Sequence, residues 1–177
     1  MQPILALLPE EKIIKQIFSL RKSIILDKLG SLDPRQKTLP HVSLVYLKSP
    51  LHQKHLKSLT LDCQNTFSNF QSVTLAVTGF QNWDNKISAM FNPKELTNLA
   101  RKASDLFSKY KILDPTTPPT KIGDHIKIAR NIKPDCVSQT IDYIKNSLPS
   151  PIEFNQLVLI DHSCTTKDIL WSTPTKP

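Results

Sequence analysis

Glycine is scarce in this chain. Only Gly30, Gly79 and Gly123 occur among its 177 residues, and they lie far apart. Phosphate-binding loops of nucleotide-binding folds need several closely spaced glycines, because their backbone must approach the phosphates. Dinucleotide-dependent redox chemistry and P-loop phosphoryl transfer are therefore excluded.

Cysteine and long apolar runs are also lacking. Cys63, Cys136 and Cys164 are odd in number and form no CxxC pair, so neither a disulfide framework nor a zinc site is expected. This usage indicates a reducing compartment, and we expect a cytoplasmic protein. No apolar run approaches the roughly 20 residues that a membrane-spanning helix needs. The apolar residues 1–8 lack a basic flank and indicate a first strand rather than a signal peptide.

The bulk composition is that of an ordinary globular protein with an excess of positive charge. The length, with 39% hydrophobic and 21% charged residues, predicts a single domain over residues 1–177. The formal net charge of +8 favours an anionic partner, either nucleic acid or a phosphorylated small molecule. The lysines are scattered, which argues against a long nucleic-acid groove.

Apolar periodicity and turn residues predict alternating helices and strands. Helices are expected at about 10–29, 51–70, 92–110 and 133–148, and strands at about 2–8, 39–47, 72–80, 86–91, 123–130, 152–161 and 169–172. The run 72–80 is expected to pair with 86–91 as a hairpin. Irregular loops containing proline lead into the strands 39–47 and 123–130, which suggests a pseudo-duplicated unit of helices and strands.

The expected strand 39–47 carries a histidine and a hydroxyl two positions apart. Because side chains alternate across a strand, His41 and Ser43 should share one face. Tyr46 falls on the opposite face by the same parity, where a packing role is expected. This strand has the pattern of one half of an active site.

The strand 123–130 repeats the pattern with His125 and Lys127 on one face. Arg130 should face away from His125 on strand parity, so we expect a structural ion pair or a surface position for it. The two histidine strands together resemble two halves of one site.

Either half alone is a weak signal. The pattern H-x-K also occurs at His52 and at His55, on a predicted helix. A structural or surface role therefore remains open for His41 or His125 taken singly, and His52, His55 and His162 are expected to be solvated or structural. Only the joint context of two strands favours a site.

Paired histidines suit phosphodiester chemistry. With an ordinary pKa near 6.5, one imidazole can accept a proton from the nucleophile while the other gives a proton to the leaving oxygen. Ser43 and Lys127 could hold the non-bridging phosphate oxygens. The scheme needs no metal and no cofactor, and the sequence has no clustered carboxylate or Cys/His ligand set.

These segments resemble the 2H phosphoesterase superfamily, the LigT-like and 2′-5′ RNA ligase-like proteins. Its signature is two H-x-[ST]-x motifs. Pro40-His41-Val42-Ser43-Leu44 matches the first, and His125-Ile126-Lys127-Ile128-Ala129-Arg130 resembles the second with one replacement. The resemblance implies an α+β bilobal fold in which two pseudo-symmetric antiparallel-rich sheets form a central cleft, with helices outside and both histidines at the centre.

The resemblance also implies an activity. Similar proteins are metal-independent phosphodiesterases that hydrolyse 2′,3′-cyclic phosphates or 2′-5′ linkages of RNA ends or nucleotides. A nucleotide or RNA terminus is then the expected substrate of a monomer, with no DNA duplex or membrane as partner. RNA ligation has the least support.

Lys127 departs from the family pattern, because it stands where the family has Ser or Thr. The departure keeps two alternatives open. One is a catalytically impaired module that binds nucleotides or RNA ends. The other is an enzyme that degrades cyclic dinucleotides, cyclic oligonucleotides or 2′-5′ oligoadenylate signals.

Two aromatic residues are placed by the sequence in or beside the expected hairpin turn. Trp83 is a candidate platform for stacking a nucleobase, an interaction worth ~1 to 3 kcal/mol per base. Phe80 is expected to belong to the core instead.

Overall fold

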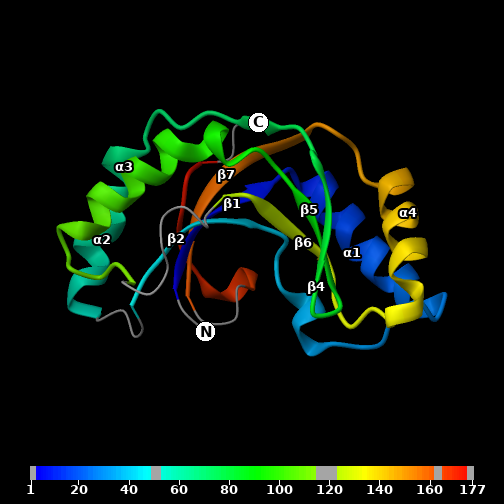
Figure 1. Cartoon of the computed structure of the whole chain (residues 1–177). Coiled ribbons are helices and arrows are strands. Elements are labelled where there is room, and N and C mark those ends of the chain that lie inside the picture. The colour runs from blue at the N-terminus through cyan, green and yellow to red at the C-terminus, as the bar shows by residue number, and fades with distance from the viewer. Residues whose placement is uncertain (1–2, 49–52, 115–122, 162–164, 175–177) are drawn as a thin grey trace.

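The computed structural model describes residues 3–48, 53–114, 123–161 and 165–174 (Figure 1). Its strands are β1 (Ile4–Pro9), β2 (Val42–Tyr46), β3 (Val73–Leu75), β4 (Gly79–Trp83), β5 (Lys86–Met90), β6 (His125–Ala129), β7 (Ile152–Ile160) and β8 (Ile169–Ser172). Its α-helices are α1 (Glu11–Leu26), α2 (Gln53–Thr66), α3 (Thr97–Ser108) and α4 (Val137–Ser147). Short 3-10 helices are η1 (Pro34–Lys37), η2 (Pro93–Leu96), η4 (Pro134–Cys136) and η5 (Thr166–Asp168).

Two antiparallel sheets form the framework. The larger has the order β2-β1-β7-β3, with β8 also paired to β7, and the smaller has the order β4-β5-β6. Strand β2 brings the first histidine motif to the larger sheet, and β6 brings the second motif to the smaller one. The expected α+β architecture with two antiparallel sheets is confirmed.

The central strand β1 explains why the chain opens with an apolar run. All six of its residues are buried. Leu5 and Leu7 belong to the main core cluster, whereas Ile4 and Ala6 belong to a smaller cluster on the other face. A strand covered on both faces needs apolar side chains at every position rather than at alternate ones.

The helices lie outside the sheets, as expected. Figure 1 shows α2 and α3 together at one end of the molecule and α1 and α4 together at the other. Helix α3 packs against β2, while α1 packs against β6 and β1. No helix in the described residues combines the length and the apolar character needed to cross a membrane.

Helix α1 is amphipathic but shorter than expected. Ile13, Ile17 and Ile24 are buried at helical spacing. The helix ends at Leu26, because Lys28 adopts a φ of 60° and takes the chain out of the helical conformation before residue 29.

The expected hairpin of 72–80 with 86–91 is only partly right. The run divides between the sheets: β3 pairs with β7, and only β4 pairs with β5. The turn is Asp84-Asn85, whose φ values of 47° and 62° suit a tight two-residue hairpin loop. Trp83 therefore lies at the end of strand β4 rather than in the turn.

Candidate active site

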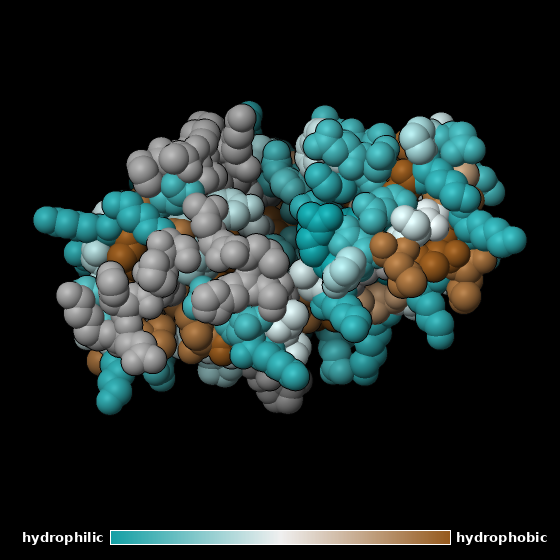
Figure 2. Space-filling model, turned by 90° about the horizontal axis from the view of Figure 1, so that it is seen from below, coloured by the Kyte–Doolittle hydropathy of each residue, from teal (hydrophilic) through white to brown (hydrophobic). Residues whose placement is uncertain are grey.

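A small polar cavity lies where the two sheets meet. Its volume is about 50 Å³, and it is lined by Arg21, Thr38, Leu39, His41, Ser43, Tyr46, His125, Lys127 and Arg130. Ligand pockets for whole small molecules are usually about 300 to 1,000 Å³. The cavity therefore suits one small polar group rather than a nucleoside. Figure 2 shows hydrophilic side chains gathered just to the right of the middle of the view.

The structure brings together both histidines and both of their expected partners. His41, directly before β2, and Ser43 on β2 come from the side of the larger sheet, and His125 and Lys127 come from the smaller one. Within each motif, the histidine and the residue two positions after it both face the cavity, as expected.

A β-bulge in β2 adds Tyr46 to this site. Ala6 pairs with Ser43 and Leu5 with Val45, so Leu44 is an extra residue without a partner on β1. The extra residue reverses the alternation, and Tyr46 rejoins the face of Ser43. Its hydroxyl donates to Ser43 Oγ at 3.2 Å. The parity prediction for Tyr46 is wrong for this reason.

A second bulge does the same for Arg130. Ser88 pairs with Lys127 and Ile87 with Ala129, which leaves Ile128 as the extra residue of β6. Arg130 consequently lines the cavity. The prediction that it faces away from His125 is wrong. The bulges lie at equivalent places in the two motifs: Leu44 directly follows Ser43, and Ile128 directly follows Lys127.

His41 is held as a neutral imidazole. Its Nδ1–H donates to the Leu39 carbonyl oxygen at 2.7 Å, so the opposite ring nitrogen Nε2 keeps its lone pair. Burial lowers the pKa of His41 to about 4, and the charges of Lys127 and Arg21 act in the same direction. A neutral ring with a free nitrogen can accept a proton at neutral pH.

His125 has a different partner. Its Nδ1 lies 2.6 Å from Asp124 Oδ1, and the carboxylate accepts the hydrogen bond. Gly123 precedes the pair with a φ of +82°, and a Cβ there would lie 3.1 Å from Leu96 Cδ1, so the turn into β6 requires glycine. A carboxylate fixes the ring and compensates its charge while Nε2 carries a proton.

The positively charged side chains of the site repel one another. Burial lowers the pKa of Lys127 to about 8, and Arg130, Lys86, Arg35 and Arg21 add to this effect. Within the described residues, the Lys127 ammonium makes no hydrogen bond or ion pair. A bound anion would relieve this repulsion.

Arg21 joins the two halves of the site. It is only 5% exposed, and its guanidinium donates to the carbonyls of Thr38 at 2.7 Å, Ile128 at 2.8 Å and Lys127 at 2.9 Å. The first carbonyl precedes His41, and the other two belong to β6. One buried side chain of α1 thus ties both motif segments together.

The remaining sequence candidates lie elsewhere. Trp83 does not line the cavity, but its ring packs edge-on against His125, with the ring centroids 4.9 Å apart. Phe80 is partly buried and packs against the main core, as expected for a core residue. His55 packs against Tyr110 at 6.2 Å, whereas His52 and His162 lie outside the described residues.

Sequence reasoning missed Asp124 and Arg21. Asp124 is adjacent to a candidate histidine, which is a visible signal. Arg21 occupies a position on the apolar stripe of α1, four residues after Ile17, where a charged residue has no reason to be unless it has buried partners. Across the described residues, no three His, Cys, Asp or Glu side chains are grouped to hold a metal ion.

Comparisons with known proteins bear on the fold. No family model matches the chain, and no curated protein matches it. Among solved structures, Escherichia coli LigT complexed with 3′-AMP is 15% identical over 89% of this chain and 86% of its own, with a TM-score of 0.54. A phosphoesterase is 16% identical over 99% and 95%, with a TM-score of 0.54. A protein from Thermus thermophilus is 14% identical over 99% and 98%, with a TM-score of 0.53. The chain has the LigT-like fold, and the fold that the sequence implied is confirmed.

Proposed function

We propose that the protein belongs to the 2H phosphoesterase superfamily and is a phosphodiesterase that hydrolyses 2′,3′-cyclic phosphates or 2′-5′ linkages of nucleotides or RNA ends. One observation carries the proposal: His41 and His125 reach the same small, cation-lined cavity from two different sheets. The LigT-like fold supports it, because LigT itself has been solved with a nucleotide that bears a 3′-phosphate.

The two histidines are assigned different tasks. Nε2 of His41 takes a proton from the attacking water as the new P–O bond forms. Nε2 of His125 gives its proton to the ribose oxygen as the old P–O bond breaks. The products are a phosphate monoester and a free hydroxyl, and the two rings have exchanged protonation states. The neutral state of His41 and the carboxylate beside His125 support this division.

The phosphate itself is bound by polar groups from both motifs. In this proposal Ser43 and Lys127, which both line the cavity, bind its non-bridging oxygens, and Tyr46 orients the Ser43 hydroxyl through the hydrogen bond that it donates. Because the cavity is so small, the nucleoside must lie outside it. Trp83, which is half-buried and contacts His125, is the proposed stacking platform there.

Adenosine 2′,3′-cyclic phosphate is the substrate that tests the proposal. We expect hydrolysis with a bell-shaped pH profile and without inhibition by EDTA, and loss of activity in His41→Ala and in His125→Ala. Full activity in either variant would overturn the proposal. A parallel panel with 2′-5′ oligoadenylate and cyclic dinucleotides separates the narrower substrate classes.

A second candidate is a nucleotide- or RNA-end-binding module without turnover, favoured by the lysine at the place of a hydroxyl. Lys127 adds a long, charged side chain to a cavity of about 50 Å³. Tight binding of 3′-AMP by the natural protein without hydrolysis of adenosine 2′,3′-cyclic phosphate, together with hydrolysis of the cyclic phosphate by Lys127→Thr, would favour the module over the enzyme.

A further inference from the structure

One fully buried hydroxyl close to the site lacks a hydrogen-bond partner. Ser88 of β5 is 0% exposed, and its Oγ is the only buried side-chain nitrogen or oxygen among the described residues that makes no hydrogen bond. The equally buried hydroxyl of Thr140, by contrast, donates to the Cys136 carbonyl oxygen at 2.7 Å. An unpaired buried hydroxyl costs free energy, so its presence in a natural protein calls for an explanation.

The register of the smaller sheet places Ser88 on the face that forms the site. Ser88 is paired with Lys127 on β6, and directly opposed residues of antiparallel strands project to the same face with Cβ atoms about 5 Å apart. Ile87 and Ala89, on either side of Ser88, belong to the main core and face the other way. Because Lys127 lines the cavity, the Ser88 hydroxyl lies beside the aliphatic stem of this lysine.

Two rings of the site meet over the same part of β5. Trp83 is paired with Lys86, two residues before Ser88. His125 is paired with Met90, two residues after Ser88. The Trp83 and His125 rings are nevertheless in contact, with their centroids 4.9 Å apart, so each extends along the sheet towards Ser88. This arrangement explains why a hydroxyl on the site face is buried.

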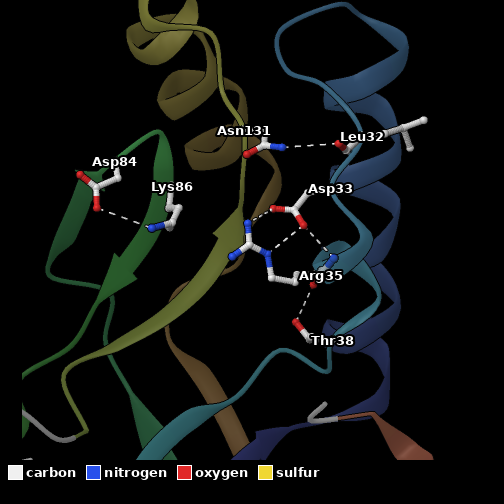
Figure 3. A network of polar contacts seen from close by, with 7 residues as sticks. All are labelled: Leu32, Asp33, Arg35, Thr38, Asp84, Lys86 and Asn131. Atoms are coloured by element: carbon white, nitrogen blue, oxygen red, sulfur yellow. Dashed lines mark hydrogen bonds and ion pairs between the residues drawn. The ribbon is translucent and has the colours of Figure 1, made fainter. Parts of the chain in front are cut away.

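Lys127 is the neighbour that needs a hydrogen-bond acceptor. Within the described residues its ammonium makes no hydrogen bond or ion pair. Figure 3 shows Lys86 on β5 at one side of β6 and Arg35 of η1 at the other. Burial lowers the pKa of Lys127, and the charges of Arg130, Lys86 and Arg35 add to this effect. An ammonium has three N–H donors, so it can donate to a bound anion and to a hydroxyl at the same time.

We propose that Ser88 is a positioning residue of the site, whose hydroxyl accepts a hydrogen bond from the Lys127 ammonium in the anion-bound protein and directs the ammonium to the anion. The anion offsets the repulsion between Lys127 and the neighbouring cations, so the ammonium can also approach the neutral hydroxyl. The inference rests on the proposed function for the identity of the anion, a phosphate of the substrate. The second motif, which has a lysine in the place of a hydroxyl, thus obtains a hydroxyl from the neighbouring strand.

Sulfate binding, measured by calorimetry at neutral pH, tests the inference without requiring turnover. In Ser88→Ala we expect the sulfate affinity to fall about tenfold, as for one hydrogen bond to a charged group. Lys127→Met should lose at least as much. Because Ser88 acts through Lys127, the double variant should bind sulfate no more weakly than Lys127→Met alone. Losses that multiply in the double variant would show that Ser88 acts independently of Lys127 and would overturn the inference.

Stability distinguishes positioning from a role in the fold. Because the Ser88 hydroxyl has no partner in the folded protein, Ser88→Ala should unfold at the same or a higher urea concentration than the natural protein. Thr140→Val is the matched control, since it removes a buried hydroxyl that has a partner. It should unfold at a lower urea concentration and keep the full sulfate affinity. If Ser88→Ala lost stability together with affinity, the hydroxyl would serve the fold and the inference would be wrong.

Hydrolysis separates failure of this inference from failure of the proposed function. For adenosine 2′,3′-cyclic phosphate, kcat/KM should also fall about tenfold in Ser88→Ala. If no substrate is hydrolysed but the sulfate affinity falls as expected, the positioning role of Ser88 stands and the proposed enzyme falls. If the natural protein hydrolyses the cyclic phosphate but Ser88→Ala binds sulfate as tightly as the natural protein, the enzyme stands and the inference is overturned.

Discussion

Lys127 is the residue at which this site departs most from the two-motif pattern. In place of a hydroxyl it brings an ammonium that burial and neighbouring cations make easy to deprotonate. Its charge should therefore depend on pH within an accessible range. The affinity of the cavity for anions should therefore depend on pH as well.

Sulfate is a suitable probe of Lys127, because its charge is constant from about pH 7 to 10. The folded-state pKa lies below the ordinary value of 10.5, at about 8, so the ammonium is charged below that pH and neutral above it. Sulfate affinity, measured by calorimetry, should fall as the pH rises through about 8. In Lys127→Arg the affinity should stay level, because a guanidinium remains charged there. If sulfate affinity declined equally in the natural protein and in Lys127→Arg, Lys127 would not be the group that titrates. Lys145→Arg, at an exposed position of α4, is the control and should behave like the natural protein.

Asp124 allows a test of the proton donor. Asp124→Asn keeps an oxygen that can accept from His125 Nδ1 but removes the charge that compensates the protonated ring. We expect kcat for the cyclic phosphate to fall by roughly 10², with KM little changed. Asp142→Asn, at an exposed position of α4, is the matched control. An unchanged kcat would exclude Asp124 from the reaction.

Residue-level reasoning from the sequence succeeded where the strands are regular. His125 and Lys127 share a face of β6 because no irregularity separates them, and His41, directly before β2, lines the cavity together with Ser43. Tyr46 and Arg130 lie beyond a bulge in each case, and a bulge depends on how the neighbouring strand pairs. The sequence of one strand does not contain that information.

At the scale of elements, helix α1 has two functions. Its apolar stripe covers β6 and β1, and Arg21 on the same side fixes the two motif segments to each other. Burial lowers the pKa of Arg21 to about 10, so the guanidinium remains charged at neutral pH. Its hydrogen bonds to carbonyls compensate part of the cost of burying it.

Removing Arg21 should destabilise the whole fold. Arg21→Met removes the donor of two buried hydrogen bonds and one partly buried hydrogen bond to backbone carbonyls, and we expect the free energy of unfolding in urea to drop by about 3 kcal/mol or more. Arg21→Lys should lose less, because it retains a charge and part of the hydrogen bonding. Arg101→Met on the exposed face of α3 should stay within about 0.5 kcal/mol of the natural protein. A similarly small change for Arg21→Met would show that the hydrogen bonds of Arg21 do not stabilise the fold.

Element positions were largely predictable, and strand pairing was less so. The helices and most strands follow from apolar periodicity and from proline at helix starts, such as Pro93 and Pro134. The run 72–80 was interpreted as one strand because its residues are uniformly β-forming. Its first part pairs with β7, nearly 80 residues further along the chain, and such a long-range choice leaves no local signal.

At the scale of the whole molecule, the site exists only because two sheets meet. Each sheet supplies one histidine and one phosphate-binding candidate, and neither half forms the cavity alone. Apolar side chains lie apart from this polar centre, as in the patch towards the end with α1 and α4 in Figure 2. The sequence predicted the two halves and the bilobal fold, whereas the cation excess at their junction became visible only in the structure.

The central claim is that His41 and His125 act together on one phosphate, and a double-mutant cycle tests it most directly. The measurement is kcat/KM for adenosine 2′,3′-cyclic phosphate in His41→Ala, His125→Ala and the double variant, relative to the natural protein. We predict that each single variant loses about a hundredfold or more, and that the double variant is scarcely worse than either, because both residues serve one step. Full activity in a single variant, or losses that multiply in the double variant, would contradict the claim.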